Sequence, residues 1–185
     1  FIKNIDTYKI NDFIGNPITF NYKDVGTFSP TTLRYLRVAS DIKKHFGDIQ
    51  GNIAEIGCGY GGQFLILDRA FSFKSYTMFD LLDVNKLIEK YLEHHLTNSY
   101  YRTSTINQFD NQTAFDFIIS NYAFSELPKK LQIKYMERFI KFSKAGYLTM
   151  NSGKERRENE NCLSIDDIKY YLPSLKIIEE EPKTY

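Results

Sequence analysis

The chain has 185 residues, the length of a single domain with one sizeable core. Its 24 Lys and Arg residues nearly balance its 23 Asp and Glu residues, which leaves a formal net charge of +1. This balance argues against a basic groove for nucleic acid and against a polybasic surface for membranes. Hydrophobic residues make up 42% of the chain and charged residues 25%, which excludes a wholly disordered protein.

Cysteine content and hydropathy indicate which structural classes and cellular location to expect. Cys58 and Cys162 form no CxxC motif and have no histidine beside them, so neither a disulfide scaffold nor a structural zinc site is indicated. No apolar run approaches the roughly 18 residues that a membrane-spanning helix needs, and no signal-peptide pattern opens the chain. We therefore expect a cytoplasmic protein without a membrane span.

The first part of the chain is predicted to be an arm followed by a helix. Residues 1–28 combine glycine, proline and scattered aromatic residues, a composition typical of an arm packed over other elements. Ser29 as the cap and Pro30 at the first helical position predict a helix start, and Gly47 predicts its end. We divide the chain into residues 1–50, the arm and cap helix, and residues 51–185, the core, within one compact domain.

The core alternates between short apolar runs and longer helical patterns. Strands are predicted over residues 52–56, 76–79, 100–105, 115–120, 147–150 and 175–178. Helices are predicted over 63–70, through 84–92, from 128 to 142, and after a capping box that begins at Ser164. Residues 151–161 lack apolar periodicity and predict a solvated loop. The alternation predicts an α/β fold with a doubly wound, mostly parallel, Rossmann-like sheet and an N-terminal helical arm.

A glycine-rich loop follows the first core strand and leads directly into a helix. It reads Gly57-Cys58-Gly59-Tyr60-Gly61-Gly62. Glycines permit a tight turn and the close approach of a ligand to backbone N–H groups at a helix N-terminus. Gly57, Gly59 and Gly62 also fit the dinucleotide pattern G-x-G-x-x-G, and the same spacing suits a tight turn that binds nothing.

Two acidic residues separate the candidate ligands. Glu55, near the end of a buried strand, is costly unless a cation or a hydrogen-bond donor meets it. It would repel a pyrophosphate but favours the ammonium and sulfonium groups of S-adenosylmethionine. Asp80 follows Gly57 by 23 residues and ends the second core strand, where an acid can accept the ribose hydroxyls; capping of the next helix is its alternative role. Together they favour S-adenosylmethionine over a nicotinamide dinucleotide.

The loop after the fourth core strand, residues 120–128, is expected to face the transferred group, because ligands of such sheets lie beyond the carboxyl ends of the strands. Asn121 and Phe124 match the outer positions of the N-P-P-Y-type loop of amino-methylating nucleic-acid enzymes. Both prolines are missing, and the near-neutral charge offers no basic groove, so this class is disfavoured. Because the strand ends in Asn121 rather than an acid, we also expect no metal.

These motifs resemble those of class I S-adenosylmethionine-dependent methyltransferases. More narrowly, the chain resembles the sugar O-methyltransferase family found with bacterial surface-polysaccharide genes. The stretches that carry the resemblance are residues 29–35, 55–63, 79–81 and 120–127. The common fold has a seventh strand inserted beside the sixth, and this sequence offers no segment for it, so the last strand of the sheet is expected to be missing.

The resemblance implies a set of cofactor contacts. The backbone of residues 57–61 would cradle the methionine part, Asp80 would hold the ribose and Leu81 would pack on the adenine. Gln63 would be a polar contact or a helix-start residue. Arg34 would meet the cofactor carboxylate or an anionic sugar, or be a surface arginine. The expected cofactor-binding residues are Arg34, Glu55, Gly57, Cys58, Gly59, Tyr60, Gly61, Gln63, Asp80, Leu81 and Asn121.

The expected reaction is an in-line displacement at a sulfonium methyl group, which requires alignment of the acceptor oxygen and help with its deprotonation. Glu126 and Tyr122 are the candidate catalytic residues, although Glu126 also suits a helix N-terminus. The prediction is an O-methyltransferase acting on a sugar hydroxyl of a polysaccharide or glycan precursor, a small-molecule or glycan substrate rather than nucleic acid. An NAD(P)-dependent oxidoreductase and a non-catalytic S-adenosylmethionine-binding partner subunit are the alternatives.

Overall fold

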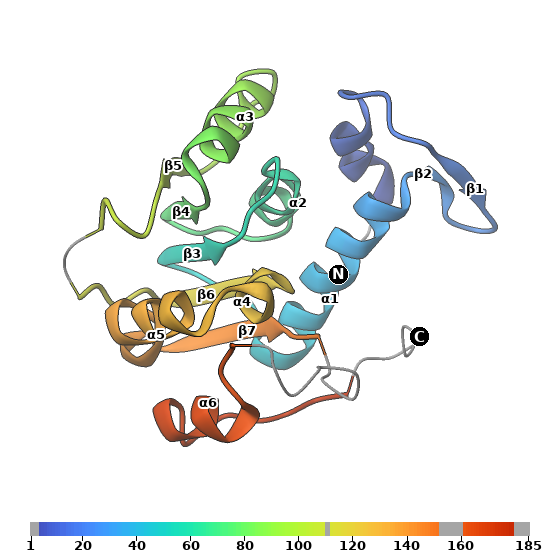
Figure 1. Cartoon of the computed structure of the whole chain (residues 1–185). Coiled ribbons are helices and arrows are strands. Elements are labelled where there is room, and N and C mark those ends of the chain that lie inside the picture. Colours follow the sequence, from blue (N-terminus) through green and yellow to red (C-terminus); the bar gives the residue numbers. More distant parts are fainter. Residues whose placement is uncertain (1–3, 110–111, 152–160, 180–185) are drawn as a thin grey trace.

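The core of the protein is a parallel sheet between two layers of helices (Figure 1). The computed structural model describes residues 4–109, 112–151 and 161–179. Within these residues the main sheet has five strands in the spatial order β5-β4-β3-β6-β7, and every neighbouring pair is parallel. The strands are β3 (Asn52–Ile56), β4 (Ser75–Phe79), β5 (Tyr100–Ser104), β6 (Phe117–Asn121) and β7 (Ala145–Thr149). The predicted α/β fold with a doubly wound parallel sheet is confirmed.

Helices cover both faces of this sheet because successive side chains along a strand point to opposite faces. One face packs against α1 (Pro30–Phe46), α2 (Gly62–Ala70) and α3 (Leu82–Leu92) and is lined by strand residues such as Ile53 and Tyr76. The other face, with Ala54 and Phe79, packs against α5 (Lys129–Arg138), the 3₁₀ turn η2 (Ile140–Phe142) and α6 (Ile165–Tyr171). The short helix α4 (Ala123–Glu126) follows β6.

The predicted caps of two helices are present. The Ser29 hydroxyl accepts a hydrogen bond from the Thr32 backbone N–H, with Pro30 in the first turn, and α1 ends at Gly47, whose φ is 75°. At α6, Ser164 and Asp167 form the predicted capping box. These short-range signals fix where each helix begins relative to the sheet.

The N-terminal arm has more structure than its composition predicts. It forms a 3₁₀ helix, η1 (Ile5–Asp12), and an antiparallel ribbon of β1 (Phe20–Tyr22) and β2 (Gly26–Phe28). In Figure 1 the ribbon extends away from the sheet, while η1 lies near the start of α1. The helix η1 packs against both α1 and α2, so the arm reaches the first turn after the glycine loop.

Two predictions at the C-terminal side are corrected. The strand predicted over residues 175–178 is wrong: residues 175–179 have no regular structure, and Ile177 and Ile178 are 62% and 60% exposed. Their apolar side chains favour a strand locally, but no neighbouring strand pairs with them. The helix predicted from 128 to 142 ends at Arg138, because Phe139 leaves helical geometry and buries its ring against Phe79 at 4.7 Å between centroids.

The loop predicted over residues 151–161 falls mostly outside the described residues. In the part of the chain that the structure describes, none of the helices is both long enough and apolar enough to span a bilayer.

Candidate functional site

The glycine loop lies where the carboxyl end of β3 meets the start of α4. The Gly57 N–H donates to the Phe79 carbonyl at 2.9 Å, and its φ is 75°. A Cβ at this position would overlap the Cβ of Ala123, so only glycine lets the loop pass this close to α4. The loop then rises to Gly61, which precedes α2 with a φ of 92°. Its backbone N–H groups therefore lie at the N-terminus of a helix, where partial positive charge accumulates.

Asp80 lies directly across from this loop, at the end of β4. Its carboxylate accepts from the Gly59 N–H at 3.1 Å and from the Leu81 N–H at 2.8 Å. An ionised carboxylate offers about four lone-pair sites, so these two bonds leave capacity for further donors. Leu81 and Leu82, which follow it, are 73% and 58% exposed. A polar anchor beside an exposed apolar surface suits a nucleoside with hydroxyls at one end and a flat base at the other.

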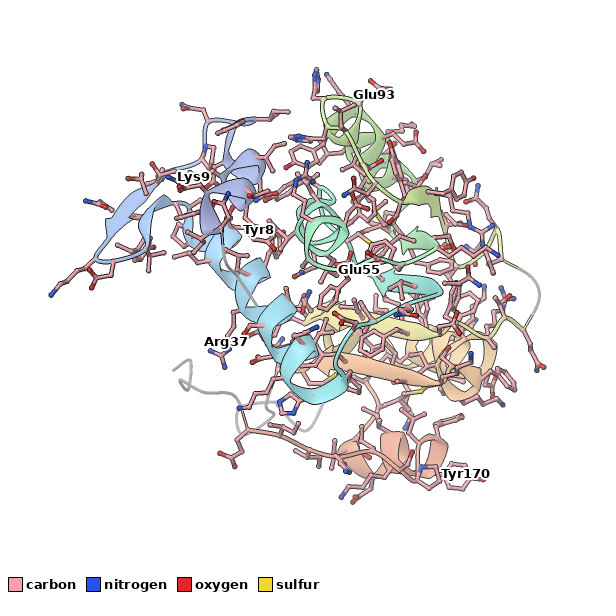
Figure 2. All side chains as sticks on the ribbon, turned by 180° about the vertical axis from the view of Figure 1, so that it is seen from behind. Tyr8, Lys9, Arg37, Glu55, Glu93 and Tyr170 are labelled. Carbon is pink, nitrogen blue, oxygen red and sulfur yellow. The ribbon has the colours of Figure 1, made fainter. Side chains whose placement is uncertain are left out.

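Glu55 is buried beneath the loop, with 1% of its surface exposed, and Figure 2 shows it enclosed between the sheet and the helices. The pKa of Glu55 is raised to about 8, chiefly by burial and also by the nearby charge of Asp80. The Tyr76 hydroxyl, which donates to Glu55 Oε2 at 2.9 Å, lowers the pKa and so offsets part of this rise. Cys58 is buried beside it, donates its thiol to the Glu55 carbonyl at 3.3 Å and has a raised pKa through burial. The Glu55 carboxyl is therefore easier to protonate than an exposed glutamate, and a cationic ligand close to it would favour its ionised form.

A chain of side-chain amides joins four elements under the loop. Gln63, also 1% exposed, donates from Nε2 to the Tyr35 carbonyl of α1 at 3.3 Å. Its Oε1 accepts from Asn121 Nδ2 at 3.2 Å, and Asn121 Oδ1 accepts from Thr149 Oγ1 at 3.3 Å. These hydrogen bonds connect α1 and α2 to the ends of β6 and β7. Gln63 therefore has a bridging position between helices and sheet.

A small pocket opens between α1 and the ends of β6 and β7. Asp41 Oδ2 accepts from Arg37 Nε and from the Tyr147 hydroxyl, each at 3.1 Å. Burial first, and then the charge of Asp41, raise the pKa of Tyr147 to about 12. The exposed Arg34 guanidinium lies 5.8 Å from the centre of the Tyr35 ring and forms no ion pair within the described ranges. The lining residues are Arg34, Tyr35, Arg37, Val38, Asp41, Asn121, Tyr122, Tyr147 and Thr149.

The two predicted catalytic residues differ in their placement. Tyr122 lines the pocket, with its backbone N–H donating to the Thr149 carbonyl at 2.8 Å. Its φ of 66° is a strained value for a bulky residue, and such strain is characteristic of functional turns. Glu126 is exposed at the end of α4, accepts from Asn151 Nδ2 at 3.1 Å and does not line the pocket.

Comparisons with known proteins identify the fold. No protein-family model matches the sequence, and no curated protein matches it. Among solved structures, the chain is similar to N-methyltransferase NodS from Bradyrhizobium japonicum WM9, with a TM-score of 0.56, 16% identity, and coverage of 80% of this chain and 84% of that chain. It is also similar to TehB from Haemophilus influenzae, with a TM-score of 0.54, 16% identity, and coverage of 74% and 49%.

A third similar structure is a Methanococcus maripaludis protein described as an S-adenosyl-L-methionine-dependent methyltransferase, with a TM-score of 0.52 and 17% identity. The alignment covers 66% of this chain and 57% of that chain, so the chain spans little more than half of that protein's length. The chain has the fold of the class I methyltransferases. At these identities the likeness establishes the fold, and the activity has to be argued from the residues.

Within this methyltransferase fold, the structure adds residues that the sequence alone did not select. Asp41 and Arg37 stand one helical turn apart on α1, a spacing that predicts an ion pair but no pocket. Tyr147 lies inside β7, where its pattern is that of a core residue. Nothing local signals that these three side chains meet, because Tyr147 and Asp41 are 106 positions apart in the chain.

Over residues 4–109, 112–151 and 161–179, no three His, Cys, Asp or Glu side chains are grouped so as to hold a metal ion. Cys58 and Cys162 are not joined by a disulfide.

Proposed function

We propose that the chain is an S-adenosylmethionine-dependent methyltransferase. The observation that carries this proposal is the apposition of Asp80 and the glycine loop, with Gly59 N–H bonded to the carboxylate at 3.1 Å and exposed Leu81 next to it. This arrangement provides a ribose anchor, an apolar surface for adenine and a backbone cradle at a helix N-terminus within one site. The methyltransferase fold supports the same conclusion.

In this proposal the cofactor contacts divide by chemistry. The backbone of residues 57–61, including Cys58 and Tyr60, would hold the methionine part, and Asp80 would hold the ribose. Glu55 would ionise and attract the cofactor's ammonium group, and Gln63 and Asn121 would form the floor of the cofactor site. Arg34, which has no ion-pair partner among the described residues, would bind the cofactor carboxylate or an anionic group of the acceptor.

We further propose that the acceptor is a sugar hydroxyl of a glycan precursor, bound in the pocket between α1 and β7. A carboxylate, arginines and tyrosine rings together suit a ligand that carries several hydroxyl groups. Asp41 supports this because both of its donors, Arg37 and Tyr147, bond to Oδ2, so that Oδ1 is available to a ligand hydroxyl.

S-adenosylmethionine, when bound, supplies an electrophilic methyl group for in-line transfer. The protein's own contribution is to orient the acceptor oxygen and to take up its proton. Tyr122, which lines the pocket, and Glu126, which is exposed at the end of α4, are the proposed groups for these steps. Replacing each in turn, as Tyr122→Phe and Glu126→Gln, and comparing the pH dependence of turnover would identify which one accepts the proton.

The experiment that tests the cofactor is calorimetric titration with S-adenosylhomocysteine, with NAD and NADP as controls, on the wild type and on Asp80→Ala. We expect saturable binding of S-adenosylhomocysteine that is lost or strongly weakened in the variant. Binding of a nicotinamide cofactor instead would refute the proposal and favour an oxidoreductase. Binding of S-adenosylhomocysteine without turnover of any glycan acceptor would favour a non-catalytic binding subunit.

A further inference from the structure

The buried side chain of Asn11, in the N-terminal arm, contacts the glycine loop. This residue lies in the last turn of η1 and is 3% exposed. Its Nδ2 donates to Thr32 Oγ1 at 2.7 Å and to the Tyr60 hydroxyl at 2.9 Å, and its Oδ1 accepts from the Tyr91 hydroxyl at 2.9 Å. One amide thus joins the start of α1, the glycine loop and α3. The bonds to Thr32 and Tyr91 are buried and the bond to Tyr60 is partly buried, so loss of the Asn11 amide removes partners from all three side chains at a cost in stability.

Tyr60 is the residue of the glycine loop that Asn11 contacts. It stands between Gly59 and Gly61, whose positive φ values of 56° and 92° are conformations that glycine adopts without steric cost. Its ring packs edge-on against Tyr91 at 5.0 Å and lies 6.1 Å from Tyr35. The loop is therefore held at its midpoint by a tyrosine whose hydroxyl is bonded to the arm.

The arm is in turn fixed to α1 and pressed against α2. The Asp12 carboxylate accepts from the Ser29 N–H at 2.9 Å and from the hydroxyls of Ser29 and Thr32, each at 2.6 Å. A Cβ on Gly62, in the first turn of α2, would lie 2.6 Å from Asn11 Oδ1. Figure 2 shows Tyr8, one turn earlier, on the side of the arm that faces α2. The arm thus has one well-defined position relative to the loop.

We propose that Asn11 is a positioning residue for the cofactor: through Tyr60 it holds the glycine loop in the conformation that binds S-adenosylmethionine, so that docking of the arm and binding of the cofactor are coupled. This inference rests on the proposed function. By thermodynamic reciprocity, an arm that raises cofactor affinity by some factor is itself stabilised by the cofactor by the same factor. The coupling can therefore be measured in two independent ways, from the affinity for the cofactor and from the stability of the docked arm.

The first readout is the dissociation constant of S-adenosylhomocysteine, measured by calorimetry on the full chain. We expect Asn11→Ala and Tyr60→Phe each to weaken binding by about tenfold, as for loss of one buried hydrogen bond. The double variant should bind no more weakly than either single variant, because both remove the same hydrogen bond.

The matched control is Tyr91→Phe, which removes another hydroxyl from the same Asn11 amide but lies in α3, outside the loop. It should lower the thermal midpoint as Tyr60→Phe does and leave the dissociation constant within about twofold.

The second readout is amide hydrogen exchange of residues 5–12 with and without saturating S-adenosylhomocysteine. We expect the cofactor product to slow exchange in the wild type and not in Tyr60→Phe. Wild-type affinity in Asn11→Ala and Tyr60→Phe, or equal losses in Tyr60→Phe and Tyr91→Phe, would overturn the role of Asn11 while leaving the cofactor assignment intact. Failure of the wild type to bind S-adenosylhomocysteine would instead overturn the proposed function, and this inference with it.

Discussion

The ionisation of Glu55 makes the stability of the free protein depend on pH in an unusual direction. Burial raises the pKa of this carboxyl from 4.5 to about 8, so the folded state holds a proton that the unfolded chain releases. Between these two pH values the folded protein binds more protons than the unfolded one, and its stability therefore falls as pH rises. At 1.36 kcal/mol per pH unit, the interval corresponds to a loss of about 5 kcal/mol, complete above pH 8.

The perturbation that tests this is Glu55→Gln. Glutamine has the shape of the protonated acid and can still accept from the Tyr76 hydroxyl, but it cannot ionise. We expect the variant to match the wild type near pH 5 and to be more stable at pH 9 by up to about 5 kcal/mol, the free energy that ionisation costs the wild type. Urea unfolding across this pH range, in the absence of cofactor, measures the difference.

A matched control is Glu93→Gln. Glu93 is an exposed acid beyond the end of α3 (Figure 2), and its replacement should not stabilise the protein at pH 9 as Glu55→Gln does, because no buried charge is removed. Parallel curves for wild type and Glu55→Gln, or a variant less stable than wild type at pH 9, would show that Glu55 is already ionised in the folded protein. The reasoning from burial would then be wrong.

Three further predictions follow from the same geometry. S-adenosylhomocysteine binding at pH 7 should release a proton from Glu55, visible as a binding enthalpy that changes with the ionisation enthalpy of the buffer; a buffer-independent enthalpy would contradict this. Gly57→Ala should cost about 2–4 kcal/mol in urea unfolding through its positive φ and its overlap with Ala123, and the added change Ala123→Gly should recover only the overlap. Ser29→Ala should cost about 1 kcal/mol through loss of the cap of α1, and an unchanged unfolding midpoint would refute that role.

Short-range patterns account for much of what could be predicted. The strand before Gly57, the turn at the loop and the cap at Ser29 each depend on residues within a few positions of one another, and all three are present. Asp80 could be selected because a parallel sheet brings the ends of β3 and β4 together, and its distance from Gly57 along the chain fixes its place in that sheet. The same reasoning misjudged residues 175–178, because apolar content favours a strand without providing a neighbour to pair with.

The sequence by itself therefore determined the fold class, the glycine loop and the acid opposite it. Only the tertiary structure decided which side chains surround them. The pocket brings Asp41 of α1 to Tyr147 of β7, 106 positions away, and Asn11 reaches Tyr60 across 49 positions. Such contacts depend on how a helix and an arm lie across the sheet, and that placement is set by the burial of whole faces rather than by any local motif. Periodicity predicts that a face is buried but not which residue it meets.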